Sequence, residues 1–179
     1  GILSAISRAK DELLSGDDFR RLAEQDRDNA AEEDAIEDAA KALEIALVYD
    51  RYEVELVKRK LVDYGDLIMR PTLELERDEI FRRSVQNQHR YVLVDEYQDV
   101  NRACARLLSA LTNNGKQLWA VGDVRQAIYR FRGAASGNVA RFPTDFPGAV
   151  RVPLGRNYRS TTEIVDTYGA FADQMAVSR

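Results

Sequence analysis

Apolar positions divide the chain into two parts with different periods. Through residues 1–62, apolar side chains recur every three or four positions, and this spacing predicts helices. A short amphipathic helix ends at Ser15-Gly16, with Asp17 or Asp18 capping the next one. A long helix follows, with an acidic face opposite an apolar stripe of Ile36, Ala40, Leu43, Leu47, Val54, Val57 and Leu61. This part is predicted to be a helical subdomain.

Beyond residue 62 the chain alternates between helical patterns and short apolar runs. Helices are predicted from Asp66 to Arg70 or beyond Pro71, and over 77–87, 101–112 and 162–176. Buried strands are predicted at 91–94, 117–121 and 149–154, with a turn at 113–115. Strands that alternate with helices in this way favour an α/β fold with a parallel sheet.

Composition narrows the class of protein. The chain is 45% hydrophobic and 31% charged, as is typical of a globular protein, and it carries no apolar run near the roughly 20 residues that cross a membrane. With no pattern of a signal peptide, we expect a cytoplasmic location and no membrane partner. Cys104 and His89 are the only residues of their kinds, which excludes an internal disulfide and the usual zinc sites.

Charge is distributed unevenly. Residues 1–60 carry 10 Lys/Arg and 16 Asp/Glu, a net of −6, whereas residues 61–179 carry 16 and 14, a net of +2. Residues 122–160 contain seven arginines and only two acids, Asp123 and Asp145. Any polyanion would therefore bind in this later part.

The first candidate site follows the apolar run at 91–94. Asp95, Glu96 and Asp99 come at its end, where parallel sheets bind ligands. In phosphoryl transfer, one acid would hold Mg²⁺ and its neighbour would orient or deprotonate a water. The alternative is a polar turn in which Asp99 caps the next helix.

Two more clusters follow. "VGDVRQAIYRFRGA" places Asp123 at the end of the second apolar run, then Gln126, and then aromatic and arginine residues in alternation, which suits single-stranded nucleic acid. The alternative is a core aromatic beside surface arginines. "LGRNYRST" offers Tyr158 to stack on a purine and Arg159 to contact a phosphate, or else a turn before a capped helix.

The order of these stretches resembles a known family. "DEYQD", "VGDVRQAIYRFRGA" and "NYRST" are similar to the second, third and fourth motifs of UvrD/Rep-type superfamily-one DNA helicases. "SRAKDELLSGDDF" resembles that family's helical insertion, subdomain 1B, and "DYGDLI" its DFDDL element. The resemblance implies a partial P-loop NTPase (RecA-like) sheet with a mostly helical N-terminal subdomain. Residues 1–62 would be the insertion, 63–150 the end of the first motor lobe and 151–179 the start of the second.

The resemblance also implies a role for each motif residue, with ATP and Mg²⁺ as cofactors. Asp95 would bind Mg²⁺, and Glu96 would be the catalytic base. Gln126 and Arg159 would contact the γ-phosphate, and Tyr158 would stack on adenine. Single-stranded DNA would contact Tyr129, Phe131 and Arg132, while Gln98, Asp99 and Asp123 would couple the nucleotide to that surface.

The sequence departs from the family in several places. Val100 and Ala127 replace Thr and Ser, and Gly65 replaces an Asp. No stretch fits G-x-x-x-x-G-K-[ST], the loop that holds the phosphates. We therefore expect an internal fragment of a helicase, inactive alone, whose open sheet edge promotes self-association or low stability.

Three functions remain open at this point. The first is part of an ATP-dependent DNA helicase that moves along single-stranded DNA and unwinds duplex junctions, in repair or recombination. The second is a DNA- or protein-binding module without a motor. The third is a metal-dependent nuclease built on Asp95, Glu96 and Asp99, which lacks a nearby Lys or His.

Overall fold

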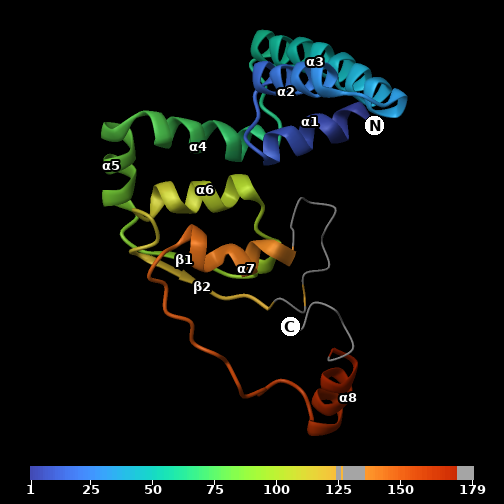
Figure 1. Cartoon of the computed structure of the whole chain (residues 1–179). Coiled ribbons are helices and arrows are strands. Elements are labelled where there is room, and N and C mark those ends of the chain that lie inside the picture. Colours follow the sequence, from blue (N-terminus) through green and yellow to red (C-terminus); the bar gives the residue numbers. More distant parts are fainter. Residues whose placement is uncertain (124–125, 127–135, 173–179) are drawn as a thin grey trace.

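The structure is a computed structural model that describes residues 1–123, 126 and 136–172 of the chain. Figure 1 shows three parts: a helical subdomain of α1–α3, a central body around a small sheet, and helix α8 set apart from both. The elements are α1 (Ile2–Asp11), α2 (Gly16–Asn29), α3 (Glu33–Arg59), α4 (Asp66–Arg77), α5 (Glu79–Gln88), β1 (Val92–Val94), the 3₁₀ turn η1 (Tyr97–Asp99), α6 (Arg102–Leu111), β2 (Leu118–Ala120), α7 (Ser136–Asp145) and α8 (Thr162–Ala172).

Helices α1, α2 and α3 form where the sequence predicts helices, but the second one is capped differently. Ser15 is the N-cap of α2, where its Oγ accepts a hydrogen bond from the Asp18 amide at 3.1 Å. The Asp18 carboxylate accepts one from the Ser15 amide at 3.2 Å in return. This is a capping box. The prediction that Asp17 or Asp18 caps α2 is therefore wrong, because both residues lie inside the first turn of the helix.

Helices α2 and α3 pack closely because small residues line their contact. Ala23 of α2 and Ala39 and Ala46 of α3 are all buried. Tyr49, the next buried residue along α3, donates a hydrogen bond from its hydroxyl to the Leu14 carbonyl at 3.0 Å. The long helix predicted from the sequence is confirmed, yet most of its apolar stripe is exposed in the described chain, and the smaller alanine face packs instead.

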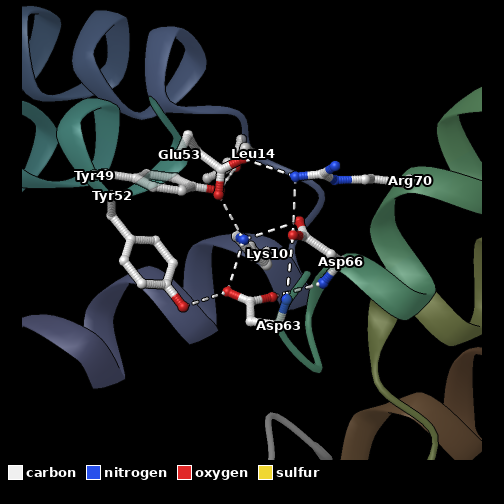
Figure 2. A network of polar contacts seen from close by, with 8 residues as sticks. All are labelled: Lys10, Leu14, Tyr49, Tyr52, Glu53, Asp63, Asp66 and Arg70. Carbon is white, nitrogen blue, oxygen red and sulfur yellow. Dashed lines mark hydrogen bonds and ion pairs between the residues drawn. The ribbon is translucent and has the colours of Figure 1, made fainter. Parts of the chain in front are cut away.

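A buried lysine joins the helical subdomain to the central body. Figure 2 shows Lys10 of α1 surrounded by three carboxylates. Its Nζ lies 2.6 Å from Glu53 Oε1, 2.8 Å from Asp63 Oδ2 and 2.9 Å from Asp66 Oδ1. The Tyr52 hydroxyl donates to Asp63 at 2.9 Å. Because these acids come from α3, the connection and α4, one cation fixes three segments together.

Helix α4 begins on a capping contact from the connection. The Asp66 amide donates to Asp63 Oδ1 at 2.8 Å, while the N-cap residue, Gly65, offers no side chain. The prediction that Asp66 caps this helix is therefore wrong, because Asp66 is its first residue. The helix continues past Pro71, as one of the two predicted ends allowed, and packs against α6. Met69 of α4 and Ala103 of α6 are buried in one cluster with Leu13, which lies between α1 and α2.

The two strands pair in parallel, as predicted. Val92, Leu93 and Val94 lie opposite Leu118, Trp119 and Ala120. The turn before β2 also forms at the predicted place, with positive φ at Asn113, Asn114 and Gly115. A Cβ on Gly115 would lie 2.8 Å from the Phe146 ring, so both its backbone and this contact require glycine.

The strands are not buried as the apolar runs predict. Leu93 is 78% exposed and Trp119 is 62% exposed, so one face of the described sheet is open. Side chains of the other face, Val92 and Val94 among them, are half-buried. Helix α7 contacts the 3₁₀ turn η1 that follows β1, and it also contacts α6.

The third predicted strand does not form. Residues 149–154 have no regular structure and are exposed, because no described strand runs beside them. Helix α7 was not predicted; it contains Gly137 and Pro143, which weaken the helical pattern. The final helix is confirmed over Thr162–Ala172, and its predicted end lies outside the described residues. Within the described residues, no helix is long and apolar enough to span a membrane.

Candidate nucleotide site

Strand β1 delivers two acids to one end of the sheet. Asp95 and Glu96 follow Val94 directly, and both side chains are exposed. Glu96 has φ 53° and ψ 44°, a left-handed conformation that is uncommon for a residue with a side chain. Its amide donates to Asp95 Oδ1 at 2.9 Å. This turn ends the strand abruptly and presents both carboxylates at the edge where parallel sheets bind ligands.

Gln98 connects the acid pair to the next strand. Its side chain is buried, and its Nε2 donates to Glu96 Oε2 at 2.5 Å. Its Oε1 accepts from the Asp123 amide at 2.9 Å. One carboxamide therefore uses its donor on the Glu96 carboxylate and its acceptor on the backbone that follows β2. The Glu96 side chain is held in place by this bond.

Asp123 and Gln126 form the second half of the site. The Gln126 amide donates to the Asp123 carbonyl at 3.0 Å, and its Nε2 donates to Asp123 Oδ2 at 3.1 Å. Backbone hydrogen bonds between the two segments continue beyond the strands themselves, since the Tyr97 amide donates to the Val121 carbonyl at 2.9 Å. The structure thus brings the predicted residues of the second and third motifs that it describes to the same edge: Asp95, Glu96, Gln98, Asp123 and Gln126.

Aromatic packing supports the 3₁₀ turn between the two halves. The Tyr97 ring meets Phe142 of α7 edge-to-face, with 4.8 Å between the ring centroids. Burial raises the pKa of Tyr97 to about 12, and the charge of Asp145 adds to this. The turn is therefore fixed by a buried, neutral phenol.

Asp99 is the last residue of the same 3₁₀ turn, but it does not cap the helix that follows. It is half-buried, and its Oδ1 has no hydrogen-bond partner among the described residues. The alternative in which Asp99 caps the next helix is wrong, because Asn101 caps α6 by accepting from the Cys104 amide at 2.9 Å.

The remaining predicted residues lie elsewhere. Tyr158 and Arg159 are exposed on a segment that leads away from the sheet toward α8 (Figure 1). Asn157 Oδ1 accepts from the Arg159 amide at 2.8 Å and from the Ser160 amide at 2.9 Å, so this stretch forms the predicted turn. The structure does not bring Tyr158 and Arg159 to the acid pair. The predicted DNA contacts lie outside the described residues; they are Tyr129, Phe131 and Arg132.

The donor set can be tested for a cation. Asp95 offers an exposed carboxylate at the strand end, which fits the oxygen ligands that Mg²⁺ prefers while keeping several waters. Among the described residues, the one group of three acids close enough to share a cation surrounds the Lys10 ammonium; its members are Glu53, Asp63 and Asp66. Among the described residues, Asp95, Glu96 and Asp99 do not form such a group.

Gly122 lies close to Gln98, whose side chain connects Glu96 to the Asp123 amide, and the sequence analysis assigned this glycine no role of its own. A Cβ on Gly122 would lie 3.0 Å from Gln98 Oε1 and 3.2 Å from both Gln98 N and Tyr97 Cβ. The sequence did place a glycine at the end of the second apolar run, directly before the predicted site residue Asp123. Its small size lets the two backbones approach.

Gly122→Ala is therefore expected to displace the Gln98 carboxamide from the Asp123 amide. We expect a loss of about 1–3 kcal/mol in the free energy of unfolding, measured by urea denaturation, as for other overpacked sites. The Asp123 amide should also exchange faster with solvent. Gly155→Ala is the matched control, since a Cβ there meets nothing within 4 Å. Equal stability of the two variants would contradict the connection through Gln98.

Comparison with known proteins decides the family. Residues 2–147 match the model of the UvrD/REP helicase N-terminal domain, which is most of the chain. The chain belongs to the UvrD/REP helicase family. This agrees with the resemblance carried by the three motifs, and the match spans both the helical subdomain and the candidate nucleotide site.

Similar curated proteins carry helicase names. The chain is 39% identical over 171 residues to the ATP-dependent DNA helicase PcrA of Leuconostoc citreum, covering 94% of this chain and 21% of that protein. It is 35% identical to PcrA of Bacillus subtilis, covering 92% and 20%, and 40% identical to the ATP-dependent DNA helicase Rep of Escherichia coli, covering 65% and 17%. The chain thus spans about a fifth of the length of these UvrD/REP relatives.

Proposed function

We propose that the chain is part of an ATP-dependent DNA helicase, and that its nucleotide site is built on Asp95, Glu96, Gln98, Asp123 and Gln126. One observation carries the proposal: in a UvrD/REP family member, a buried carboxamide ties the exposed acid pair to the backbone of the third motif. The names of the relatives support ATP and DNA as ligands.

In this proposal the two adjacent acids divide the work. Mg·ATP, when bound, supplies the phosphoanhydride bond that is broken. Asp95 would hold the cation through its exposed carboxylate. Glu96 would orient a water and accept its proton as the water oxygen bonds to the γ-phosphorus and ADP leaves, and the bond from Gln98 fixes the Glu96 carboxylate in position.

Gln98 and Gln126 connect this chemistry to the DNA surface. A shift of the Glu96 carboxylate would move the Gln98 side chain. It would thereby move the Asp123 amide, whose nitrogen lies 2.9 Å from Gln98 Oε1. Gln126, bonded to Asp123, would sense the γ-phosphate from the same edge. Asp99 would join Gln98 and Asp123 in coupling the nucleotide to the DNA surface. The residues that we propose as contacts for single-stranded DNA follow directly in the sequence; they are Tyr129, Phe131 and Arg132.

The rest of the motor completes the site. Residues 63–150 would be the end of the first motor lobe and 151–179 the start of the second, with 1–62 as the helical insertion. Closure of the two lobes would bring Arg159 to the γ-phosphate and Tyr158 to the adenine. No stretch of this chain fits the phosphate-binding loop, so the remainder of a helicase chain would supply it. We propose that the helicase acts in DNA repair or recombination, on duplex junctions, in the cytoplasm.

The test is ATP hydrolysis with and without single-stranded DNA, measured side by side on this chain and on a longer protein that includes it and a phosphate loop. We expect a silent chain beside a DNA-stimulated longer protein. Turnover by this chain alone would overturn the assignment of the phosphate loop to other residues. Silence of both, together with retained DNA binding, would favour a binding module without a motor.

A further inference from the structure

Helix α3 carries an apolar stripe that is mostly exposed in the described chain. Leu47 is 63% exposed and Val57 is 64% exposed, and Ile36 and Val54 are exposed as well. Figure 1 shows α3 along the outer side of the helical subdomain. The stripe is therefore a free surface of the part of the chain that the structure describes.

The stripe has the spacing of a helix that pairs with another helix. Its members, which we call the seam, alternate in steps of four and three residues along α3: Ile36, Ala40, Leu43, Leu47, Asp50, Val54 and Val57. An average step of about 3.5 residues is the period of a coiled-coil seam. Asp50 is the one polar member, and its carboxylate forms an ion pair with Arg20 of α2.

The charges beside the seam change sign halfway along the helix. On the flank away from α2, the residues that directly follow Ile36, Leu43, Asp50 and Val57 lie next to the seam; they are Glu37, Glu44, Arg51 and Lys58. The residues that follow the other seam positions lie one step farther from α2; they are Lys41, Val48 and Glu55. The other flank is closed, since it contains the alanines that are buried against α2. Within the described chain, Glu44 and Arg51 form no ion pair, and Glu37 and Lys58 pair only with exposed neighbours one turn away. Two acids thus precede two bases on the open flank.

We propose that this surface binds α3 of a second copy of the chain, in antiparallel orientation. Antiparallel pairing sets the acidic half of one helix beside the basic half of the other, so Glu44 meets Arg51 of the second copy and Glu37 meets its Lys58. Parallel pairing would not bring these residues together, because it aligns like halves. This association goes beyond the proposed function and does not depend on it.

The same register matches the seam residues. Leu43 would face Val54 of the second copy, Ala40 would face Val57, and Leu47 would face Asp50 near the two-fold axis. By the two-fold symmetry, Asp50 of each copy faces Leu47 of the other, so the pair contains two such polar layers. They cost some affinity, yet a polar core position fixes the register of helix pairs. In each copy, the ion pair with Arg20 of α2 already compensates the charge of Asp50.

Charge swaps test the pairing, and sedimentation equilibrium of the full chain measures it. In Glu44→Arg, two symmetric contacts change from attraction to repulsion, and we expect dimerisation to weaken by roughly tenfold. Arg51→Glu should weaken it equally. An equimolar mixture of the two variants should recover the wild-type affinity, because both contacts between unlike chains again join opposite charges. Asp38→Arg is the matched control that should leave the affinity unchanged, since Asp38 lies on the far side of α3 from the seam and its side chain is 82% exposed.

Three outcomes would overturn the proposal. The first is a wild-type chain that stays monomeric at all concentrations, which would assign the stripe to another partner. The second is a dimer that neither swap weakens, which would place the contact elsewhere, for example on the open face of the sheet. The third is a mixture that associates no better than either variant alone.

Discussion

Replacing Glu96 by Gln is expected to lower DNA-stimulated ATP hydrolysis by at least about 100-fold in a longer protein that includes this chain and a phosphate loop. Removal of a general base typically costs a factor in this range. Gln keeps the size of the side chain and can still contact Gln98, so the fold should not change. Steady-state release of phosphate at saturating single-stranded DNA measures the effect.

Binding measurements separate this chemistry from a loss of structure. Affinity for ATP and for single-stranded DNA should remain close to wild type, because Asp95 and the proposed DNA contacts are unchanged. Glu79→Gln is the matched control, as it makes the same substitution on the exposed surface of α5. If Glu96→Gln hydrolyses ATP as fast as this control, another residue is the base and the assignment fails.

The sequence predicts the elements well wherever a local pattern determines them. The helical periods of α3 and α6, the parallel pair of strands and the turn at Asn113-Asn114-Gly115 all depend on neighbours within a few residues or on short apolar runs. The strand at 149–154 fails for the opposite reason. An apolar run becomes a strand only beside another strand, and the described chain offers none there.

Burial was harder to predict than helix or strand. The apolar stripe of α3 is the strongest periodic signal in the first 62 residues, yet Ala39 and Ala46 form the packed face. Alanines carry little weight in a hydrophobic pattern, but their small size lets α2 approach closely. A large apolar face shows that a helix has a partner surface, and it does not show whether the same chain supplies the partner.

The candidate nucleotide site was predicted in part. Motif order identified Asp95, Glu96 and Asp123, and the parallel register places them at one edge. The two bonds of Gln98 could not be predicted, because they depend on the left-handed turn at Glu96 and on the close approach at Gly122. Neither feature has a periodic signal in the sequence.

Replacing Lys10 by Met is expected to destabilise the chain by about 3–5 kcal/mol, the usual cost of leaving a buried charge without its partner. The Lys10 side chain is 1% exposed and its ammonium contacts Glu53, Asp63 and Asp66. Met keeps the length of the side chain but leaves Asp63 without a cation beside it, while Arg70 still pairs with Glu53 and Asp66. Urea denaturation followed by circular dichroism measures the free energy of unfolding. Lys41→Met, which removes an exposed lysine of α3, should change it little.

The dependence of stability on pH distinguishes this charge effect from a packing defect. Burial raises the pKa of Asp63, but the bonds from Lys10, the Asp66 amide and Tyr52 outweigh it and lower that pKa below its ordinary value. A lowered pKa gives stability that is present above about pH 4 and is lost as the pH falls further. The contribution of Asp63 to the stability of the wild-type chain should therefore stay constant between about pH 5 and about pH 8.

The variant should show a different dependence. Without the Lys10 ammonium, the largest of the contacts that lower the pKa of Asp63 is lost, so this pKa should be higher than in the wild-type chain, although the bonds from the Asp66 amide and Tyr52 remain. The folded variant then binds a proton at higher pH than the folded wild-type chain does, and lowering the pH from about 6 to about 3 should stabilise Lys10→Met relative to the wild-type chain. If the loss in the free energy of unfolding of Lys10→Met stays constant over this range, the variant has lost packing alone. Lys10 and its three carboxylates would then hold the helical subdomain to α4 by shape and not by charge.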